Sequence, residues 1–332
     1  MNMENYKGIM VYIENRNNQI ENVSLELLGE ANKLAKELDT EVTALIVGKD
    51  IKPLAKEVTA YGANNVILVD DSRLEKYMVG PYATSIERVI NSYKPEIFLI
   101  GATTIGRDVA PRVSAKIKTG LTADCTQLAI DEKTKLLLMT RPAFGGNLMA
   151  TIICKNHRPQ MSTVRPGVMD KLERDDSRTS KVDTFDAKLE DSDFNVEILE
   201  ETLDTKKQIN IEEASKLVSC GRGVGSPEHI KTFEKLASLI GAEVSCSRAV
   251  VDNGWLPKDH QVGQTGKTVK PDLYMAMGIS GAIQHIAGME SSNYIVAVNK
   301  KSSAPIFEVS DLGIVGDMHK IAPELIKLLE QE

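Results

Sequence analysis

The sequence predicts an α/β protein of two domains, each a mostly parallel sheet flanked by helices. Three observations support this fold class. Short, almost continuously apolar runs alternate with amphipathic stretches, which is the pattern of parallel strands buried on both faces. The 332 residues are too many for one small domain. A strongly charged stretch, residues 170–208, separates two regions with this alternation.

The first half alternates strand and helix up to residue 117. The expected strands cover residues 8–14, 41–48, 64–70 and 95–103. The expected helices cover residues 24–38, 51–62 and 82–93, and the pattern changes after residues 103–117. Strand-like runs joined by short turns then predict an antiparallel extension of the same sheet, at residues 134–146, 148–156 and 159–169.

The charged stretch predicts an exposed connector, with a last edge strand at residues 195–201. We place the domain boundary near its end, which gives an N-terminal domain of residues 1–207 and a C-terminal domain of residues 208–332. After it the alternation resumes. Strands are expected at residues 214–220, 242–252, 271–278 and 293–299, and helices at residues 226–241 and 318–332. Residues 279–289 are expected to form a loop and helix, and residues 304–317 a strand and turn.

Composition excludes several classes of function. The net charge is −7, and no basic run is long enough to follow a phosphate backbone, which argues against a nucleic-acid partner. No apolar run approaches the ~20 residues that cross a bilayer, so no membrane insertion is expected. The N-terminus goes almost directly into a strand without a leader, which predicts a cytoplasmic and most simply bacterial protein.

The cysteines predict no metal site. Cys125, Cys154, Cys220 and Cys246 are far apart and form no C-x-x-C pair, whereas zinc and iron–sulfur sites use closely spaced ligands. We expect reduced thiols in packed strands.

The segment CGRGVGSPEHI joins an expected strand to a helix. Ser226 is placed as the N-cap, with Pro227 at the first helical position. Glycines let the backbone approach a ligand, and the helix start favours an anion. The spacing is G-x-G-x-G rather than the dinucleotide fingerprint G-x-G-x-x-G, so the motif alone is weak. Arg222 inside the loop suits a phosphate.

The segment MGISGAIQH repeats this device after another strand. Gly278 and Gly281 permit close approach, and the hydroxyl of Ser280 can cap the helix or donate. The N–H groups of residues 281–283 would then point at the same anion. Two such strand ends at the carboxyl edge of one parallel sheet imply a crevice for a pyrophosphate. His285 lies about one turn further on, beside this anion site.

Two further segments flank the expected crevice. QVGQTGK lacks the complete phosphate-loop pattern and does not run from a strand into a helix, so a nucleoside triphosphatase is not indicated. Thr265 instead places a hydroxyl on an exposed glycine-flanked loop. Ser247 and Arg248 follow a neighbouring strand, where a ligand role for the arginine is favoured.

Together these segments resemble a known family. PDLYMAMGISGAIQHIAGM, with SRAVVDNGWLPKDHQVGQTGK and CGRGVG, closely resembles the FAD-binding domain of the α subunit of electron-transfer flavoproteins, a Rossmann-like domain. The first half resembles that subunit's other domain, including RPAFGGNLMATI, so the resemblance covers essentially the whole chain. It implies non-covalent FAD, a heterodimer with the β subunit, and single-electron transfer to or from an acyl-CoA dehydrogenase. Such a protein is an electron carrier rather than a stand-alone enzyme.

The resemblance also implies individual roles. The Thr265 hydroxyl would lie near flavin N5, His285 would reach the C2 carbonyl oxygen, and Arg248 would lie against the ring. Arg248 and His285 would stabilise the negative charge that an added electron puts on the flavin. The implied cofactor contacts are Arg222, Ser247, Arg248, Gln261, Val262, Gly263, Gln264, Thr265, Gly266, Ser280, Gly281, Ala282, Ile283, Gln284 and His285, with Asn299, Asp317 and Met318 on the adenosine side.

Alternatives stay open at this point. A nicotinamide-dependent dehydrogenase would use the same crevice, but neither its proton donor nor its dinucleotide fingerprint is identifiable. A nucleotide-binding regulator would ignore the second half. Within the family, members either pass single electrons or bifurcate them from NADH to a low-potential acceptor such as ferredoxin, with the second flavin in the β subunit. The form of residues 141–167 favours the bifurcating type. Arg141, Phe144 and Arg165 would face the β-subunit cofactor or only hold the antiparallel extension. The charged connector would suit a hinge between the domains.

Overall fold

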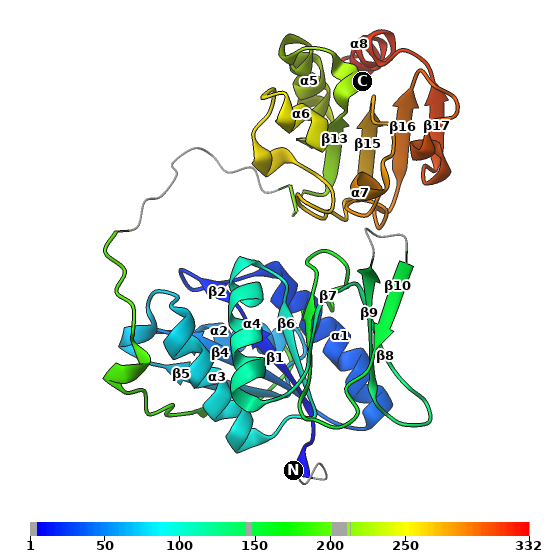
Figure 1. Ribbon diagram of the computed structural model, residues 1–332. Coiled ribbons are helices and arrows are strands. Elements are labelled where there is room, and N and C mark those ends of the chain that lie inside the picture. Colours follow the sequence, from blue (N-terminus) through cyan, green and yellow to red (C-terminus); the bar gives the residue numbers. More distant parts are fainter. Residues whose placement is uncertain (1–4, 144–147, 201–210, 213, 332) are drawn as a thin grey trace. The chain divides into compact units, whose positions relative to one another are not determined.

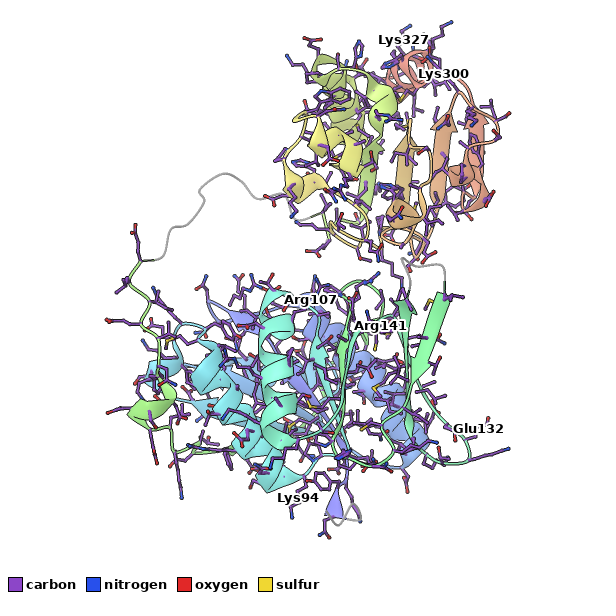
Figure 2. The ribbon with its side chains drawn as sticks, viewed as in Figure 1. Lys94, Arg107, Glu132, Arg141, Lys300 and Lys327 are labelled. Carbon is purple, nitrogen blue, oxygen red and sulfur yellow. The ribbon has the colours of Figure 1, made fainter. Side chains whose placement is uncertain are left out.

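The computed structural model describes residues 5–143, 148–200, 211–212 and 214–331, and the chain divides into two compact units (Figure 1). Described residues up to 200 form the first unit except Leu148, and those from 211 onward belong to the second. The boundary expected at residues 207 and 208 lies outside the described residues. Exposed charged side chains such as Lys94, Glu132 and Lys327 point outward from each unit (Figure 2).

A seven-stranded sheet, parallel in all its pairings, forms the centre of the first unit. Its strand order is β12-β5-β4-β1-β6-β11-β7. The strands are β1 (Ile9–Ile13), β4 (Val42–Gly48), β5 (Asn65–Asp70), β6 (Ile97–Gly101), β7 (Leu121–Cys125), β11 (Gln160–Val164) and β12 (Lys181–Thr184). A two-stranded ribbon follows β1, formed by β2 (Asn15–Arg16) and β3 (Gln19–Ile20).

Both faces of this sheet are buried because successive strand residues point to opposite sides. Ile9, Val11 and Ile13 belong to one apolar cluster, whereas Met10 and Tyr12 belong to another. Helices α1 (Asn22–Leu38) and α2 (Leu54–Ala60) contribute to the first cluster. Helices α3 (Val79–Tyr93) and α4 (Thr104–Ile117) contribute to the second, so α1 and α4 cover opposite faces (Figure 1). The predicted layered α/β fold is confirmed here.

The predicted antiparallel extension is wrong in two respects. Strands β8 (Gln127–Ile130), β9 (Leu137–Ala143) and β10 (Leu148–Ile152) form a separate three-stranded sheet. The run expected as its last strand is instead β11, which lies parallel between β6 and β7. Short turns in the sequence suggested hairpins, but every residue of β11 is buried, as a central parallel strand requires. Strand β7 was not anticipated, because its burial alternates irregularly.

The charged connector was also misjudged. Its residues 181–184 form β12, which pairs with β5 at the edge of the sheet, and Ala187 and Leu189 are buried against the second cluster. The edge strand expected at 195–201 is not found in residues 195–200, and residue 201 is not described. An edge strand pairs through its backbone while its side chains stay exposed, so hydrophobicity gives no signal for it.

The second unit has a five-stranded parallel sheet in the order β14-β13-β15-β16-β17. Its strands are β13 (Lys216–Cys220), β14 (Glu243–Cys246), β15 (Leu273–Met277), β16 (Ile295–Asn299) and β17 (Leu312–Val315). Numbered within this unit, the order is 2-1-3-4-5, which is the flavodoxin-like order rather than the Rossmann order 3-2-1-4-5-6. The sheet therefore reverses its winding between β13 and β15, where such folds bind ligands.

The two faces of this sheet are covered differently. Helices α5 (Ile230–Ile240) and α8 (Met318–Leu329) pack on one face, next to the short α6 (Arg248–Asp252). The other face buries Tyr274 and Ala276 against Val262 and Ile306, which come from a loop and a 3-10 turn. The strand expected at 242–252 ends at Cys246. In the loop and helix expected over 279–289, the helix is only the single turn α7 (Ile283–Ile286), and residues 304–317 begin with that 3-10 turn before β17.

Candidate functional site

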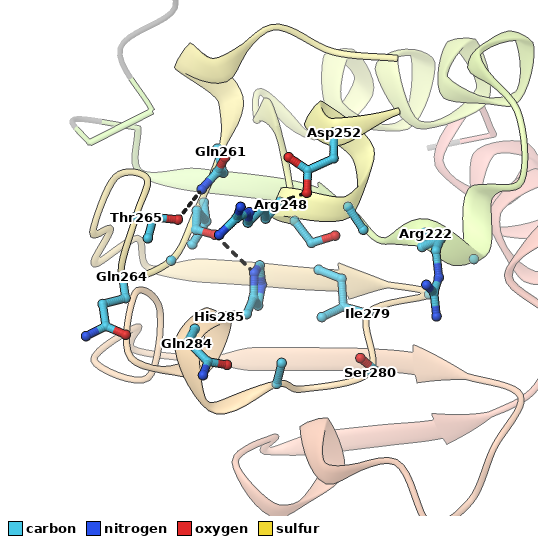
Figure 3. Close-up of a pocket in the computed structure, with 17 residues that line it drawn as sticks. Arg222, Arg248, Asp252, Gln261, Gln264, Thr265, Ile279, Ser280, Gln284 and His285 are labelled. Carbon is cyan, nitrogen blue, oxygen red and sulfur yellow. Dashed lines mark hydrogen bonds and ion pairs between the residues drawn. The ribbon is translucent and has the colours of Figure 1, made fainter. Parts of the chain in front are cut away.

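A pocket of about 710 Å³ opens at the carboxyl ends of β13, β14 and β15 (Figure 3). Its volume is within the range of small-molecule sites. Figure 3 shows Arg222 at one end and Gln264 with Thr265 at the other, with His285 between them. The lining residues are Arg222, Gly223, Ser247, Arg248, Ala249, Asp252, Gln261, Val262, Gly263, Gln264, Thr265, Gly278, Ile279, Ser280, Ala282, Gln284 and His285.

Glycines bring two strand ends into direct contact at the point where the sheet reverses. Gly221 follows β13, and its N–H donates to the carbonyl of Met277 at 2.8 Å. A Cβ on Gly221 would overlap the carbonyl oxygen of Gly278 and lie 2.7 Å from the nitrogen of Ile279. Gly278 has a φ of +68°, which favours glycine. The two strand ends therefore lie backbone against backbone, and Gly278 lines the pocket without a side chain.

The loop of residues 261–267 is held by its own hydrogen bonds. The N–H of Lys267 donates to the carbonyl of Gln261 at 2.7 Å, and the N–H of Gly263 donates to the carbonyl of Lys267 at 3.0 Å. The Gln261 side-chain amide donates to the Thr265 hydroxyl at 3.0 Å. Since that hydroxyl oxygen accepts from Gln261, its own hydrogen is left to donate elsewhere.

Gly263 lets the same loop approach α7. Its φ is +134°, and an added Cβ would lie 2.7 Å from the carbonyl oxygen of Gln284. The N–H of Gln264 donates to that carbonyl at 2.7 Å. The loop is thus attached directly to the segment that carries His285.

Two arginines and one aspartate supply the charge of the pocket. Arg222 lies in the loop after β13, and Arg248 begins α6. The Nε of Arg248 lies 3.3 Å from Oδ2 of Asp252, one helical turn further on, and both side chains are mostly exposed. Exposed pairs of this type are weak, so Arg248 can turn toward a bound anion at little cost.

His285 is buried and has a partner for each ring nitrogen. Its Nδ1 lies 3.1 Å from the carbonyl oxygen of Val262, and its Nε2 lies 2.9 Å from the hydroxyl of Tyr274. Burial lowers the pKa of His285 to about 4. The ring is therefore neutral at pH 7, with Nδ1–H donating to the carbonyl of Val262, while Nε2 faces the Tyr274 hydroxyl, which donates to Ser219 at 2.7 Å. The expected donation to a flavin carbonyl is not preformed, because both nitrogens have partners within the chain.

The structure brings most of the expected contacts together in this pocket but not all. The expected residues that line it are Arg222, Ser247, Arg248, Gln261, Val262, Gly263, Gln264, Thr265, Ser280, Ala282, Gln284 and His285. Those that do not are Gly266, Gly281, Ile283, Asn299, Asp317 and Met318. Gly266 closes the loop by donating to the carbonyl of Gly263 at 2.9 Å, and Ile283 is exposed.

The residues expected on the adenosine side hold the loops from behind. Asn299 donates through its side chain to the carbonyl of Ile279 at 2.8 Å. Asp317 caps α8 and pairs with Lys300 at 3.2 Å. Met318 is buried, and its sulfur lies 2.7 Å from the position of a Cβ on Gly278. Their contact with a ligand stays a prediction.

The N-cap position predicted for Ser226, with Pro227 after it, is confirmed, but neither Ser226 nor Ser280 caps a helix through its side chain. Ser226 occupies the N-cap position of a 3-10 turn that precedes α5, but its hydroxyl donates to Glu228 at 3.1 Å instead of capping the backbone. Ser280 does not cap α7, whose N-cap is Ala282. Because α7 is a single turn, its dipole contributes far less than the full helix we expected.

Asp252, Ala249 and Ile279 also line the pocket, although the sequence did not predict them there. Residues 248–252 were read as the end of a strand, which hid the i, i+4 spacing of Arg248 and Asp252 on α6. That spacing of opposite charges was the available signal.

Several residues singled out in the sequence do not line the pocket. Arg165 is buried and donates to Asp124 at 2.7 Å, so it stabilises the first unit, and Phe144 lies outside the described residues. The cysteines are free thiols, and Cys154 follows β10 rather than lying in a strand as expected. Within the described ranges, no three His, Cys, Asp or Glu side chains are grouped to hold a metal ion.

None of the described helices has both the length and the apolar character that crossing a bilayer requires.

Comparisons with known proteins agree with these features. Residues 9–190 match the family model of the electron transfer flavoprotein domain, and residues 210–290 match that of the electron transfer flavoprotein FAD-binding domain. The chain is 52% identical over 329 residues to the electron transfer flavoprotein subunit alpha of Thermoanaerobacterium thermosaccharolyticum, covering 99% of each chain.

Two relatives carry more specific names. The chain is 44% identical over 357 residues to the acryloyl-CoA reductase electron transfer subunit beta of Anaerotignum propionicum, covering 99% of this chain and 97% of that one. It is 41% identical over 325 residues to the lactate dehydrogenase (NAD(+),ferredoxin) subunit LctC of Acetobacterium woodii, covering 98% of this chain and 77% of that one. By these matches along its whole length, the chain belongs to the electron transfer flavoprotein α subunits, a family of electron-transfer proteins.

Proposed function

We propose that the chain binds FAD in the pocket of its second unit and carries single electrons to or from an acyl-CoA dehydrogenase, as a heterodimer with a β subunit. The observation that supports this best is the glycine-lined contact of β13 and β15 where the sheet reverses. A Cβ on Gly221 would overlap the backbone of Gly278, and a Cβ on Gly278 would overlap the side chain of Met318, so only glycine lets the two strand ends approach each other this closely beside the pocket. The residues present therefore fit the cofactor.

The polar residues of the pocket suit different parts of such a ligand. Arg222 is exposed at one end, where a guanidinium would bind pyrophosphate oxygens. Gln261 fixes the Thr265 hydroxyl at the other end, which leaves a donor for a ring nitrogen. Bound FAD would supply the one-electron chemistry itself. The contacts expected from the sequence, including Asn299, Asp317 and Met318, remain part of this proposal.

The partners follow from the names of relatives. One relative is an electron transfer subunit of acryloyl-CoA reductase, which supports a partner that acts on acyl-CoA thioesters. Another belongs to a lactate dehydrogenase that uses NAD⁺ and ferredoxin, and this supports bifurcation with NADH and ferredoxin reached through the β subunit. The first unit would pack on that subunit.

Flavin analysis of the heterodimer tests the proposal. The chain is co-purified with its β subunit, and the flavins released by heat are identified and counted. Two FAD per heterodimer would support bifurcation, whereas one FAD with AMP would support a simple carrier. A colourless heterodimer that takes up no added FAD refutes the proposal, and NADH oxidation by the isolated chain would point to a nicotinamide-dependent dehydrogenase instead.

A variant that removes one positive charge from the pocket makes the test specific to this site. Arg222→Gln removes a guanidinium that is exposed in the pocket, so the FAD affinity is expected to fall about tenfold or more while the fold is kept. Arg112→Gln removes an exposed arginine of the first unit and is expected to keep the affinity of the wild-type chain. Equal FAD affinity of both variants would exclude this pocket as the site.

A further inference from the structure

The loop that carries Arg222 has a hydrogen-bond donor for each of its carbonyls. We define this Arg222 loop as residues 221–224. The carbonyls of Gly221 and Arg222 accept from N–H groups further along the chain, at 3.1 and 3.2 Å, which forms a tight 3-10 turn. The carbonyls of Gly223 and Val224 are bound from outside this turn by two histidine side chains. The backbone of the loop is therefore held by side chains of other segments.

The two histidines come from different helices. Nδ1 of His229, the N-cap residue of α5, lies 2.9 Å from the carbonyl oxygen of Val224. Nε2 of His319, in the first turn of α8, lies 3.3 Å from the carbonyl oxygen of Gly223. A carbonyl can only accept, so each of these nitrogens carries a hydrogen. The Ser226 hydroxyl is a second neighbour of Nδ1 of His229, at the longer distance of 3.4 Å.

The two histidine rings also contact each other. Their centroids are 4.7 Å apart, and their planes are inclined by 57°. The N–H of His319 donates to the capping carboxylate of Asp317 at 3.0 Å, which fixes the start of α8. Neither histidine lines the pocket. Both side chains therefore hold the Arg222 loop from outside the pocket.

Such support matters because the loop is rich in glycine. Val224 is fully buried, but it lies between Gly223 and Gly225, and glycine leaves the backbone more freedom than any other residue. A loop that must be ordered when a ligand binds lowers the affinity by the free energy of ordering. A carbonyl without its donor would also be free to turn toward the pocket, where its partial negative charge would repel a phosphate. The two histidine bonds remove both costs.

We propose that His229 and His319 are positioning residues for the pyrophosphate of the cofactor. By binding two carbonyls they hold the Arg222 loop in one conformation, so that the guanidinium of Arg222 is in place before the ligand arrives. The inference rests on the proposed function, because Arg222 is the residue assigned there to the pyrophosphate. It concerns the diphosphate half of the ligand, so the binding of ADP depends on the two histidines as the binding of FAD does.

Variants that differ in the donor test this on the heterodimer after release of its flavin. His229→Leu and His319→Leu remove the donors, and each is expected to weaken FAD binding about fivefold, the effect of one neutral hydrogen bond. His229→Asn and His319→Gln place an amide N–H at the same number of bonds from the backbone as the donating ring nitrogen, and are expected to restore the affinity. His157→Leu changes an exposed histidine of the first unit and is expected to bind FAD like wild type.

A double-mutant cycle with Arg222→Gln shows whether the histidines act through Arg222. Without the guanidinium, His229→Leu and His319→Leu are expected to change the FAD affinity by less than about twofold. A general weakening of the fold would instead lower the affinity by the same factor in both backgrounds. NMR of the heterodimer labelled with ¹⁵N-histidine, in alkaline buffer, gives a second readout. In wild type the ring hydrogen is expected on Nδ1 of His229 and on Nε2 of His319, whose signals are assigned by their loss in the leucine variants.

Three results would overturn the proposal. One is an FAD affinity of both leucine variants equal to that of wild type. Another is the same fivefold loss with and without the Arg222 guanidinium. A third is a hydrogen on the opposite nitrogen of either ring. If wild type takes up no FAD, the proposed function fails, and the same cycle measured with ADP decides the inference. If ADP is not bound either, Arg222 serves no pyrophosphate, and the inference fails as well.

Discussion

Acid should destabilise the second unit through His285. Burial holds its pKa at about 4 in the folded chain, compared with an ordinary value of 6.5. Between these values the unfolded chain binds a proton that the folded chain does not, so stability is complete above pH 6.5 and falls as the pH decreases toward 4. The shift corresponds to a loss of about 3 kcal/mol at pH 4 and about 2 kcal/mol at pH 5.

The single tryptophan makes this loss measurable in the relevant unit. Trp255 packs against the core of the second unit, so its fluorescence reports urea unfolding of that unit. The flavin-free chain is unfolded at pH 7 and pH 5, and His285→Gln is compared with wild type and with His157→Gln, which changes an exposed histidine of the first unit. Wild type and His157→Gln should lose about 2 kcal/mol more than His285→Gln. Equal losses in all three chains would refute the neutral buried ring.

Further predictions concern the pocket. Gly221→Ala places a Cβ against the carbonyl of Gly278 and should weaken FAD binding at least tenfold, measured by equilibrium dialysis. Unchanged affinity would show that the close contact of Gly221 with Gly278 is not needed for FAD binding. Asp252→Asn frees Arg248 from its ion pair and should raise the one-electron potential of bound flavin, whereas Arg248→Lys should lower it. Both potentials are measured by spectroelectrochemistry. Shifts of the two variants in the same direction would refute the role of the Arg248–Asp252 ion pair. Thr265→Ala should shift the potential more than it weakens binding; outright loss of FAD would make Thr265 a structural anchor.

The sequence predicted the parts of the fold whose physics is local. Strands β1, β4 and β6 are buried on both faces and appear as uninterrupted apolar runs. Strand β12 was missed because an edge strand with exposed side chains has no hydrophobic pattern. The pairing of β11 was missed because the neighbours of a parallel strand are set by distant segments, here β6 and β7.

The same distinction applies to the site. Glycine loops at strand ends identified the pocket, since a turn that follows a strand is a local feature of the chain. Strand order was not readable, and it is the order that puts the ends of β13 and β15 side by side. Tyr274 looked like an ordinary core residue of an apolar strand. Its contact with His285 depends on how α7 returns across the sheet.

The uneven covering of the second sheet explains why polar side chains lie on one of its faces. On the face with α5 and α8, apolar side chains fill the space between strands and helices. On the opposite face, a loop and a single turn carry His285 onto the sheet, and the strands beneath it supply hydroxyls. Hydroxyls can donate or accept, whereas fixed charges cannot change sign. The pocket therefore combines two arginines of fixed charge with a neutral histidine that the Tyr274 hydroxyl and the Val262 carbonyl hold in place.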